Sequence, residues 1–232
     1  MQKYYYGLYG KIKLIHNVNV SDYNEYMSNF INKIMLRDEW LKEVHESKNV
    51  KGYVFSNFYP YESDGIYKKD NVYSFYINVF DKNLALRLKN CLEQEEIVIE
   101  INIKIQPFKK IKTLRTNSLC LISLKNKDEK FWVKNDGLAL LMNGLNNNAN
   151  LKHNLFLGEI QKETNFIQSL YIRSKHELYA NYKKGKLVGV QLDIVVKDDE
   201  KSQLLANICL ATGLGEKNSL GCGYCIIPKE GK

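Results

Sequence analysis

The first half of the chain shows hydrophobic patterns of strands and helices in turn. Residues 4–15 alternate well enough for a strand, and from Tyr23 to Met35 apolar residues recur every three or four positions, which is typical of one helix face. A short helix is predicted over 37–44 and a strand over 53–58. Strands over 72–80 and 95–105 flank a helix over 83–93, and the isoleucines at odd positions from 97 to 105 are expected on one face. This β-α-β-β-α-β order is the ferredoxin-like pattern, which RRM domains share.

The second half repeats this order more loosely after Pro107, which interrupts the pattern and indicates a domain boundary. We predict strands near 112–124 and 129–133, a helix over 136–146, a hairpin with arms near 171–182 and 187–196, a helix near 199–211 and a strand over 224–228. The hairpin turn is expected at Lys184-Gly185. The stretch 147–170 is too long for an ordinary connection, so it indicates an insertion or an unrecognised short element. The expected fold class is therefore α+β, with two tandem ferredoxin-like domains over 1–106 and 107–232.

Charge and composition favour an acidic partner. The 232 residues carry 34 Lys and Arg against 26 Asp and Glu, a formal charge of +8, and they include 16 Tyr. Lysines that neutralise phosphates and tyrosines that stack on bases suit RNA, although an AT-rich genome would enrich the same residue types. Five cysteines without a scaffold spacing, no signal peptide and no membrane-length apolar run predict a cytoplasmic protein. No cofactor is expected, because neither the acidic residues nor the lone Cys222-x-x-Cys225 pair forms a metal-ligand set.

A glycine-rich segment near the C-terminus, the glycine loop, reads Gly-Leu-Gly-Glu-Lys-Asn-Ser-Leu-Gly-Cys-Gly over residues 213–223. Glycines let a backbone turn tightly and approach a ligand, and exposed N–H groups in such a loop can bind phosphates. The spacing is wrong for a Rossmann fingerprint, and a P-loop would lead into a helix where a strand is predicted here. Composition alone leaves a plain surface turn open. The candidate RNA-binding residues in this loop are Gly213, Gly215, Lys217, Asn218, Ser219, Gly221 and Gly223.

The order and position of this segment resemble the C-terminal signature of the CRISPR-associated repeat-RNA endoribonucleases, the sixth-numbered Cas family of the RAMP superfamily. Cys222 departs from that signature, which usually has an aromatic residue there. The family's second signature is a His, a Lys six residues later, and a strand with an aromatic and a Ser. Residues 45–56 are similar, with His45, Lys51, Phe55 and Ser56 in matching places. Residues 45–52 are called the histidine loop below.

The resemblance implies metal-independent cleavage of precursor transcripts within the CRISPR repeat, which leaves a 2′,3′-cyclic phosphate and a 5′-hydroxyl. RNA carries its own nucleophile, so such an enzyme needs only proton transfer and charge stabilisation. Imidazoles ordinarily exchange protons near neutral pH, and a lysine can stabilise charge that develops on a phosphate. We therefore expect His45 as general acid, Lys51 as electrostatic stabiliser and Lys48 as an RNA contact. The expected partner is CRISPR repeat RNA, with an effector complex or a homodimer as further candidates and no membrane.

The base that would accept the 2′-hydroxyl proton stays open. Some relatives have a Tyr fifteen residues before the His, where this chain has Phe30. Tyr26 lies one turn earlier on the same helical face, where core packing is the competing interpretation. The alternative function is a non-catalytic RAMP-type subunit that holds guide RNA through the same glycine loop. A generic RRM-like module has less support, because the first half lacks an RNP-type strand.

Overall fold

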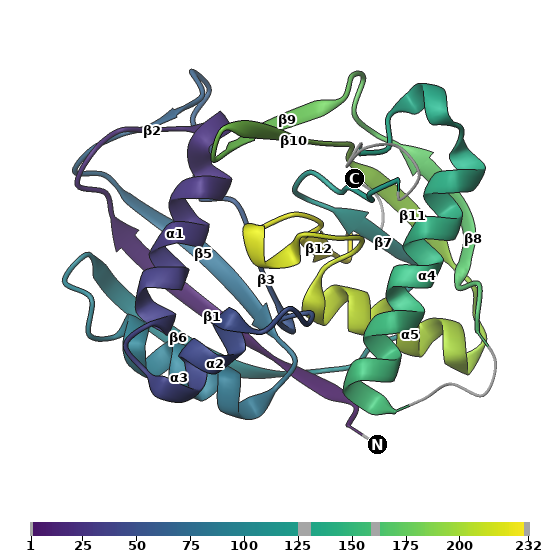
Figure 1. Ribbon diagram of the computed structural model, residues 1–232, viewed down its shortest axis with the longest axis horizontal. Coiled ribbons are helices and arrows are strands. Elements are labelled where there is room, and N and C mark those ends of the chain that lie inside the picture. The colour runs from purple at the N-terminus through teal and green to yellow at the C-terminus, as the bar shows by residue number, and fades with distance from the viewer. Residues whose placement is uncertain (1, 125–130, 159–162, 230–232) are drawn as a thin grey trace.

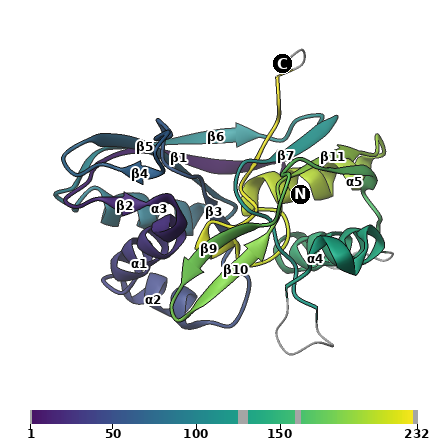
Figure 2. The same ribbon diagram turned by 90° about the horizontal axis from the view of Figure 1, so that it is seen from above.

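The first half of the chain folds into a four-stranded antiparallel sheet that is covered on one face by helices. The computed structural model describes residues 2–124, 131–158 and 163–229. The strand order is β3-β5-β1-β6, and Figure 2 shows α1, α2 and α3 together on one side of this sheet. The strands of the sheet are β1 (Tyr4–Lys13), β3 (Tyr53–Phe55), β5 (Val72–Val79) and β6 (Val98–Pro107). The helices are α1 (Tyr23–Met35), α2 (Glu39–Glu46) and α3 (Lys82–Leu92). A small separate pair, β2 (Val18–Asn19) with β4 (Ile66–Tyr67), follows β1 and precedes β5.

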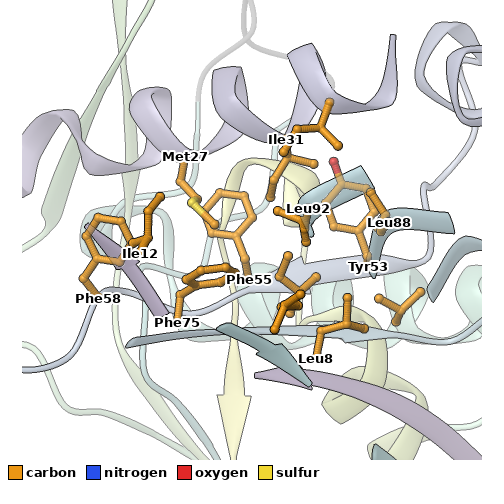
Figure 3. Packing of buried hydrophobic residues seen from close by; sticks show 14 of the residues in the cluster. Leu8, Ile12, Met27, Ile31, Tyr53, Phe55, Phe58, Phe75, Leu88 and Leu92 are labelled. Atoms are coloured by element: carbon orange, nitrogen blue, oxygen red, sulfur yellow. The ribbon is translucent and has the colours of Figure 1, made fainter. Parts of the chain in front are cut away.

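Alternation along β1 produces the core of this half. Leu8 and Ile12 point toward the helices and are fully buried, together with Phe55 from β3, Phe75 from β5 and Met27 from α1 (Figure 3). The predicted elements of this half are all present within a few residues. The isoleucine stripe is only partly confirmed: Ile101 is buried, whereas Ile99 is the residue skipped by a β-bulge in the pairing with β1 and is exposed.

The second half forms a second four-stranded sheet with the strand order β12-β7-β11-β8. In both sheets the last strand of the domain lies beside the first, and the third lies between the first and the second. This shared order is that of the ferredoxin-like fold and confirms the predicted fold class. The elements are β7 (Thr113–Thr116), α4 (Leu138–Leu157), β8 (Ile167–Ile172), β11 (Leu192–Val196), α5 (Glu200–Thr212) and β12 (Cys225–Ile226). β6 ends at Pro107, and the boundary predicted after residue 106 stays a prediction.

The helix predicted over 136–146 is wrong in its end, because α4 continues to Leu157. Its second half is rich in asparagine, a poor helix former, but tertiary bonds override this preference. The buried Asn146 accepts a hydrogen bond from the N–H of Phe166 at 3.0 Å, and the buried Asn150 accepts one from the N–H of Thr164 at 3.0 Å. The asparagines therefore fasten α4 to the segment that enters β8, within the stretch that the sequence left unassigned.

The strand predicted near 112–124 is wrong beyond Thr116. After β7 the backbone leaves the sheet and bonds to the glycine loop: the carbonyl of Leu119 accepts from Gly223 N at 2.7 Å, and that of Leu121 accepts from Glu216 N at 3.0 Å. Residues 129 and 130 of the strand predicted over 129–133 lie outside the described residues, and the described residues 131–133 form only an isolated bridge, between Phe131 and Ser123. Within the part of the chain that the structure describes, no helix has both the length and the apolar character needed to cross a bilayer.

The predicted hairpin is divided into two pairs of strands. β8 pairs with β11 in the sheet, while the tip forms a separate pair, β9 (Leu178–Tyr182) with β10 (Gly185–Gly189). The chain reverses at Lys183-Lys184, one residue before the expected turn, and Lys183 adopts a positive φ of 52°. The tip reaches the first half of the molecule, where Asn181 Nδ2 donates to Asp22 at 2.6 Å (Figure 1).

Candidate functional site

The glycine loop lies between the two halves of the molecule, where the yellow C-terminal segment of Figure 1 passes beside β3. All four of its predicted glycines have positive φ, from 70° to 89°. A Cβ on Gly221 would lie 2.4 Å from the ring of Phe55, and one on Gly223 would lie 1.9 Å from the carbonyl oxygen of Leu214. On Gly213 and Gly215 the nearest atoms would lie at 2.4 and 2.5 Å, so all four positions require glycine both for conformation and for close packing.

Most N–H groups of the loop are occupied by hydrogen bonds to backbone carbonyls within the loop or on neighbouring segments. The donors are Gly213, Leu214, Glu216, Leu220, Gly221, Cys222 and Gly223. Lys217, in a left-handed conformation, is exposed, and Ser219 is half-buried. Of the residues predicted to bind RNA in this loop, these two present side chains that a ligand can reach.

Asn218 is buried inside the loop. Its Nδ2 donates to the carbonyl of Cys222 at 2.9 Å, and its Oδ1 accepts from the ammonium of Lys152 on α4 at 2.7 Å. The amide therefore braces the loop from within. Sequence reasoning missed Lys152 entirely, because nothing in the asparagine-rich segment around it indicates contact with a loop some sixty residues later.

The histidine loop begins in the last turn of α2. At the start of that helix, the carboxylate of Asp38 accepts from the N–H of Leu41 at 2.9 Å, which is an N-cap. His45 lies in the last turn and is half-buried. Six residues of α2 thus separate the cap from the histidine, and the buried Leu41 fixes the helix against the core.

Lys51 folds back onto the end of α2. Its ammonium donates to the carbonyls of Val44 at 2.6 Å and His45 at 2.7 Å, and it also reaches the carbonyl of Ser47. Partial burial lowers the pKa of Lys51. The side chain therefore places positive charge at the carboxyl end of the helix that carries His45, and a contact with phosphate would have to replace one of these bonds.

The two loops meet at a cavity of about 790 Å³ between the halves of the molecule, called the interdomain cavity below. Lys48 and Lys51 line it from the histidine loop, and Lys217 and Ser219 line it from the glycine loop. α4 contributes Asn147 and Asn148 to the wall. Lys152 and Glu216 also line the cavity. Four lysines against one carboxylate, together with several amide groups, suit an anionic, hydrogen-bonding ligand. His45 is not among the residues that line this cavity; its link to the lining is its backbone carbonyl, which accepts from Lys51 at 2.7 Å.

The two candidates for a tyrosine base lie elsewhere. Tyr26 and Phe30 line a separate groove on α1 together with His16, whose ring packs edge-on against Tyr26 at 5.3 Å between centroids. Burial raises the pKa of Tyr26, which disfavours the phenolate. The core-packing interpretation of Tyr26 fits this position, and the groove shares no lining residue with the interdomain cavity.

Other chemistry finds little support in the described residues. Across residues 2–124, 131–158 and 163–229, no three His, Cys, Asp or Glu side chains form a group that could hold a metal ion. Four of the five cysteines are buried, and Cys91 is half-buried. Burial raises the pKa of Cys209 to about 11 and that of Cys120 to about 12. Such thiols stay protonated at neutral pH and make poor nucleophiles.

Comparison with known proteins agrees with this arrangement. The family model for CRISPR associated protein Cas6, C-terminal, matches residues 103–227, more than half of the chain and the part that contains the glycine loop. Among curated proteins, none matches the sequence.

Solved structures share the fold over nearly the whole chain. A structure described as CRISPR associated protein Cas6 superimposes with a TM-score of 0.73 at 18% identity, and covers 97% of this chain and 99% of that one. A Cas6-related protein from Pyrococcus furiosus gives 0.71 at 18% identity, with 98% and 99% covered. A RAMP protein described as binding different RNA substrates gives 0.70 at 18% identity, with 97% and 100% covered. With its C-terminal family signature and its two ferredoxin-like sheets, this chain belongs to the Cas6 family.

Proposed function

We propose that this protein is an endoribonuclease that cleaves CRISPR repeat RNA without a metal ion. One observation carries the proposal: the histidine loop and the glycine loop, far apart in sequence, meet at a single lysine-lined cavity. Membership of the Cas6 family and the fold shared with an RNA-binding RAMP protein support RNA as the ligand. The formal charge of +8 favours association with a polyanion.

In the proposed reaction the RNA attacks itself. The 2′-oxygen forms a bond to the adjacent phosphorus while the bond from phosphorus to the 5′-oxygen breaks, which yields a 2′,3′-cyclic phosphate. The imidazolium of His45 donates a proton to the departing 5′-oxygen, and the proton of the 2′-hydroxyl passes to solvent. A proton transfer of this kind is worth about 10² to 10⁴ in rate.

The lysines have two different tasks in this proposal. Lys48 and Lys217 are both exposed and line the interdomain cavity, so they bind the RNA backbone. Lys51 stabilises charge that develops on the phosphate and also holds the end of α2, because its ammonium lies among the last carbonyls of the helix. The cavity walls formed by Asn147 and Asn148 complete the binding surface.

The test is a comparison of His45→Ala with His16→Ala, because His16 is an exposed histidine on the separate α1 groove. In EDTA we expect wild type and His16→Ala to cleave the repeat RNA at similar rates. His45→Ala should cleave about 10² to 10⁴ times more slowly, since only the acid is lost. Its affinity for the RNA should stay close to that of wild type.

Two results would count against the proposal in different ways. Unchanged cleavage by His45→Ala removes this residue from the mechanism. Tight binding with no cleavage by wild type, with or without a divalent metal, favours a guide-RNA-binding subunit instead.

A further inference from the structure

Lys152 is an unusual residue for its position. It lies on α4 and is fully buried, and it is the only Asp, Glu, Lys or Arg in the described residues that is buried. No salt bridge within those residues involves it. A lone buried cation is costly unless its donors are all satisfied, so the acceptors around it explain why the site tolerates it.

All three acceptors belong to the glycine loop. The ammonium donates to the carbonyl of Gly213 at 2.6 Å, to the carbonyl of Gly215 at 2.9 Å and to Oδ1 of Asn218 at 2.7 Å. Nδ2 of Asn218 in turn donates to the carbonyl of Cys222 at 2.9 Å. One side chain of α4 thus fixes both the entry of the loop and its middle.

The number of donors makes the charge essential. An ammonium has three N–H donors, one for each acceptor, whereas a neutral amine has two and would leave one buried oxygen unpaired. The ionisable groups that face Lys152 are the thiols of Cys120, Cys209 and Cys225 and the carboxylate of Glu216. Burial lowers the pKa of Lys152 and raises those of the three thiols. Glu216 is itself held by Ser123, whose hydroxyl donates to it at 2.6 Å.

We propose that Lys152 is a positioning residue of the RNA site, whose ammonium holds the glycine loop in the shape that presents Lys217 and Ser219 to the RNA. This inference rests on the proposed function for its RNA ligand. Lys152 lines the interdomain cavity, but its side chain is fully buried and its three donors are all bonded to the loop, so it acts on the RNA through the loop. RNA affinity should therefore depend on the charge of a residue that contributes no phosphate contact of its own.

The first experiment compares Lys152→Met with Lys217→Met, a matched change at the exposed cation of the same loop. We measure affinity for the repeat RNA over a range of salt concentrations, and backbone amide exchange of residues 213–223 without RNA. Lys152→Met should bind about tenfold more weakly, since buried acceptors lose their donor, with an unchanged salt slope and faster exchange in the loop. Lys217→Met should lower the salt slope by about 0.7 to 0.9 and leave loop exchange as in wild type.

The second experiment keeps the test valid if Lys152→Met does not fold. Lys152→Arg retains a charge at every accessible pH, so we compare its loop protection factors with those of wild type as the pH is raised from neutral. Wild type should lose protection at a lower pH than Lys152→Arg. Identical profiles, or a folded Lys152→Met with wild-type loop exchange and affinity, would overturn the inference. Loop exchange is measured without RNA, so it tests the role of Lys152 in holding the loop independently of RNA binding. If wild type binds no repeat RNA, that result overturns the proposed function and not the role of Lys152 in the loop.

Discussion

At the scale of single residues, the glycine loop meets two separate physical demands. Positive φ angles exclude most side chains on conformational grounds, while neighbouring atoms exclude a Cβ on steric grounds. Gly65, which precedes β4 and lies outside the loop, is constrained only by its conformation. Its φ is 73°, and no atom lies within 4 Å of a built Cβ. Gly223 meets both, with a φ of 70° and the carbonyl of Leu214 at 1.9 Å. The pair therefore separates the cost of conformation from the cost of packing.

We expect Gly65→Ala to lower the free energy of unfolding by about 1 kcal/mol, the cost of a left-handed alanine. Gly223→Ala should lower it by about 2 to 5 kcal/mol, because the new methyl group also displaces Leu214. Urea denaturation of both variants measures the difference. Equal losses would show that the loop relaxes around the added atom and that its close packing is unimportant.

The tight turns of the glycine loop could be predicted from the sequence, because closely spaced glycines are typical of a backbone that turns tightly. Individual roles were less so. The sequence could not indicate that Asn218 points inward, or that Phe55 occupies the space beside Gly221, because both facts depend on contacts between segments far apart in the chain. Lys152 was missed for the same reason, since its acceptors lie on another element.

At the scale of elements, α2 is held at both ends by side chains. Asp38 caps its first turn and also accepts from Arg87 at 2.7 Å, while Lys51 binds its last carbonyls. Because His45 lies on this short helix, fixing the two ends also fixes the backbone that carries its side chain. The prediction from sequence placed this helix two residues early, which is the usual uncertainty of helix ends.

Asp38→Ala should lower the free energy of unfolding at neutral pH by about 1 kcal/mol, the usual worth of an N-cap. Asp38→Asn should lose less, because asparagine also caps helices well. The hydrogen bond from the N–H of Leu41, and to a smaller extent the one from Arg87, holds the pKa of Asp38 below its ordinary value of 3.8. The unfolded state therefore binds the proton more tightly, and the stabilisation present above pH 3.8 is lost as the pH falls through the lower folded pKa. Thermal melts of wild type and Asp38→Ala should converge in acid; a gap that persists there would contradict this role of the carboxylate.

Elements with ordinary local patterns were predicted well, and those stabilised by distant partners were not. α4 was predicted to end early because its asparagines have low helix propensity, yet Asn146 and Asn150 bond across to residues 164–166. The strand predicted through residue 124 contains the right apolar residues, but its backbone bonds to the glycine loop after Thr116. In both cases a tertiary contact overrides the local preference.

At the scale of the whole molecule, two sheets of the same topology place the C-terminal loop against the first domain. Asn24 on α1 donates to the carbonyl of Leu220 in the loop at 2.6 Å, and Asn78 on β5 donates to the carbonyl of Leu210 in α5, the helix that precedes the loop, at 2.9 Å. The fold class followed from the order of elements in the sequence. The meeting of the two loops did not, because it depends on how the two sheets pack, and no local pattern encodes that.

If the 2′-hydroxyl of the RNA is the nucleophile at this site, a substrate that lacks this one hydroxyl group must resist cleavage. Wild type is incubated in EDTA with the repeat RNA and with the same RNA carrying a single 2′-deoxy nucleotide at the cleavage position. We predict that the first is cut to a 2′,3′-cyclic phosphate and a 5′-hydroxyl, while the second is bound with similar affinity and stays intact. Cleavage of the deoxy substrate at that position, or cleavage that requires a divalent metal, would contradict the account.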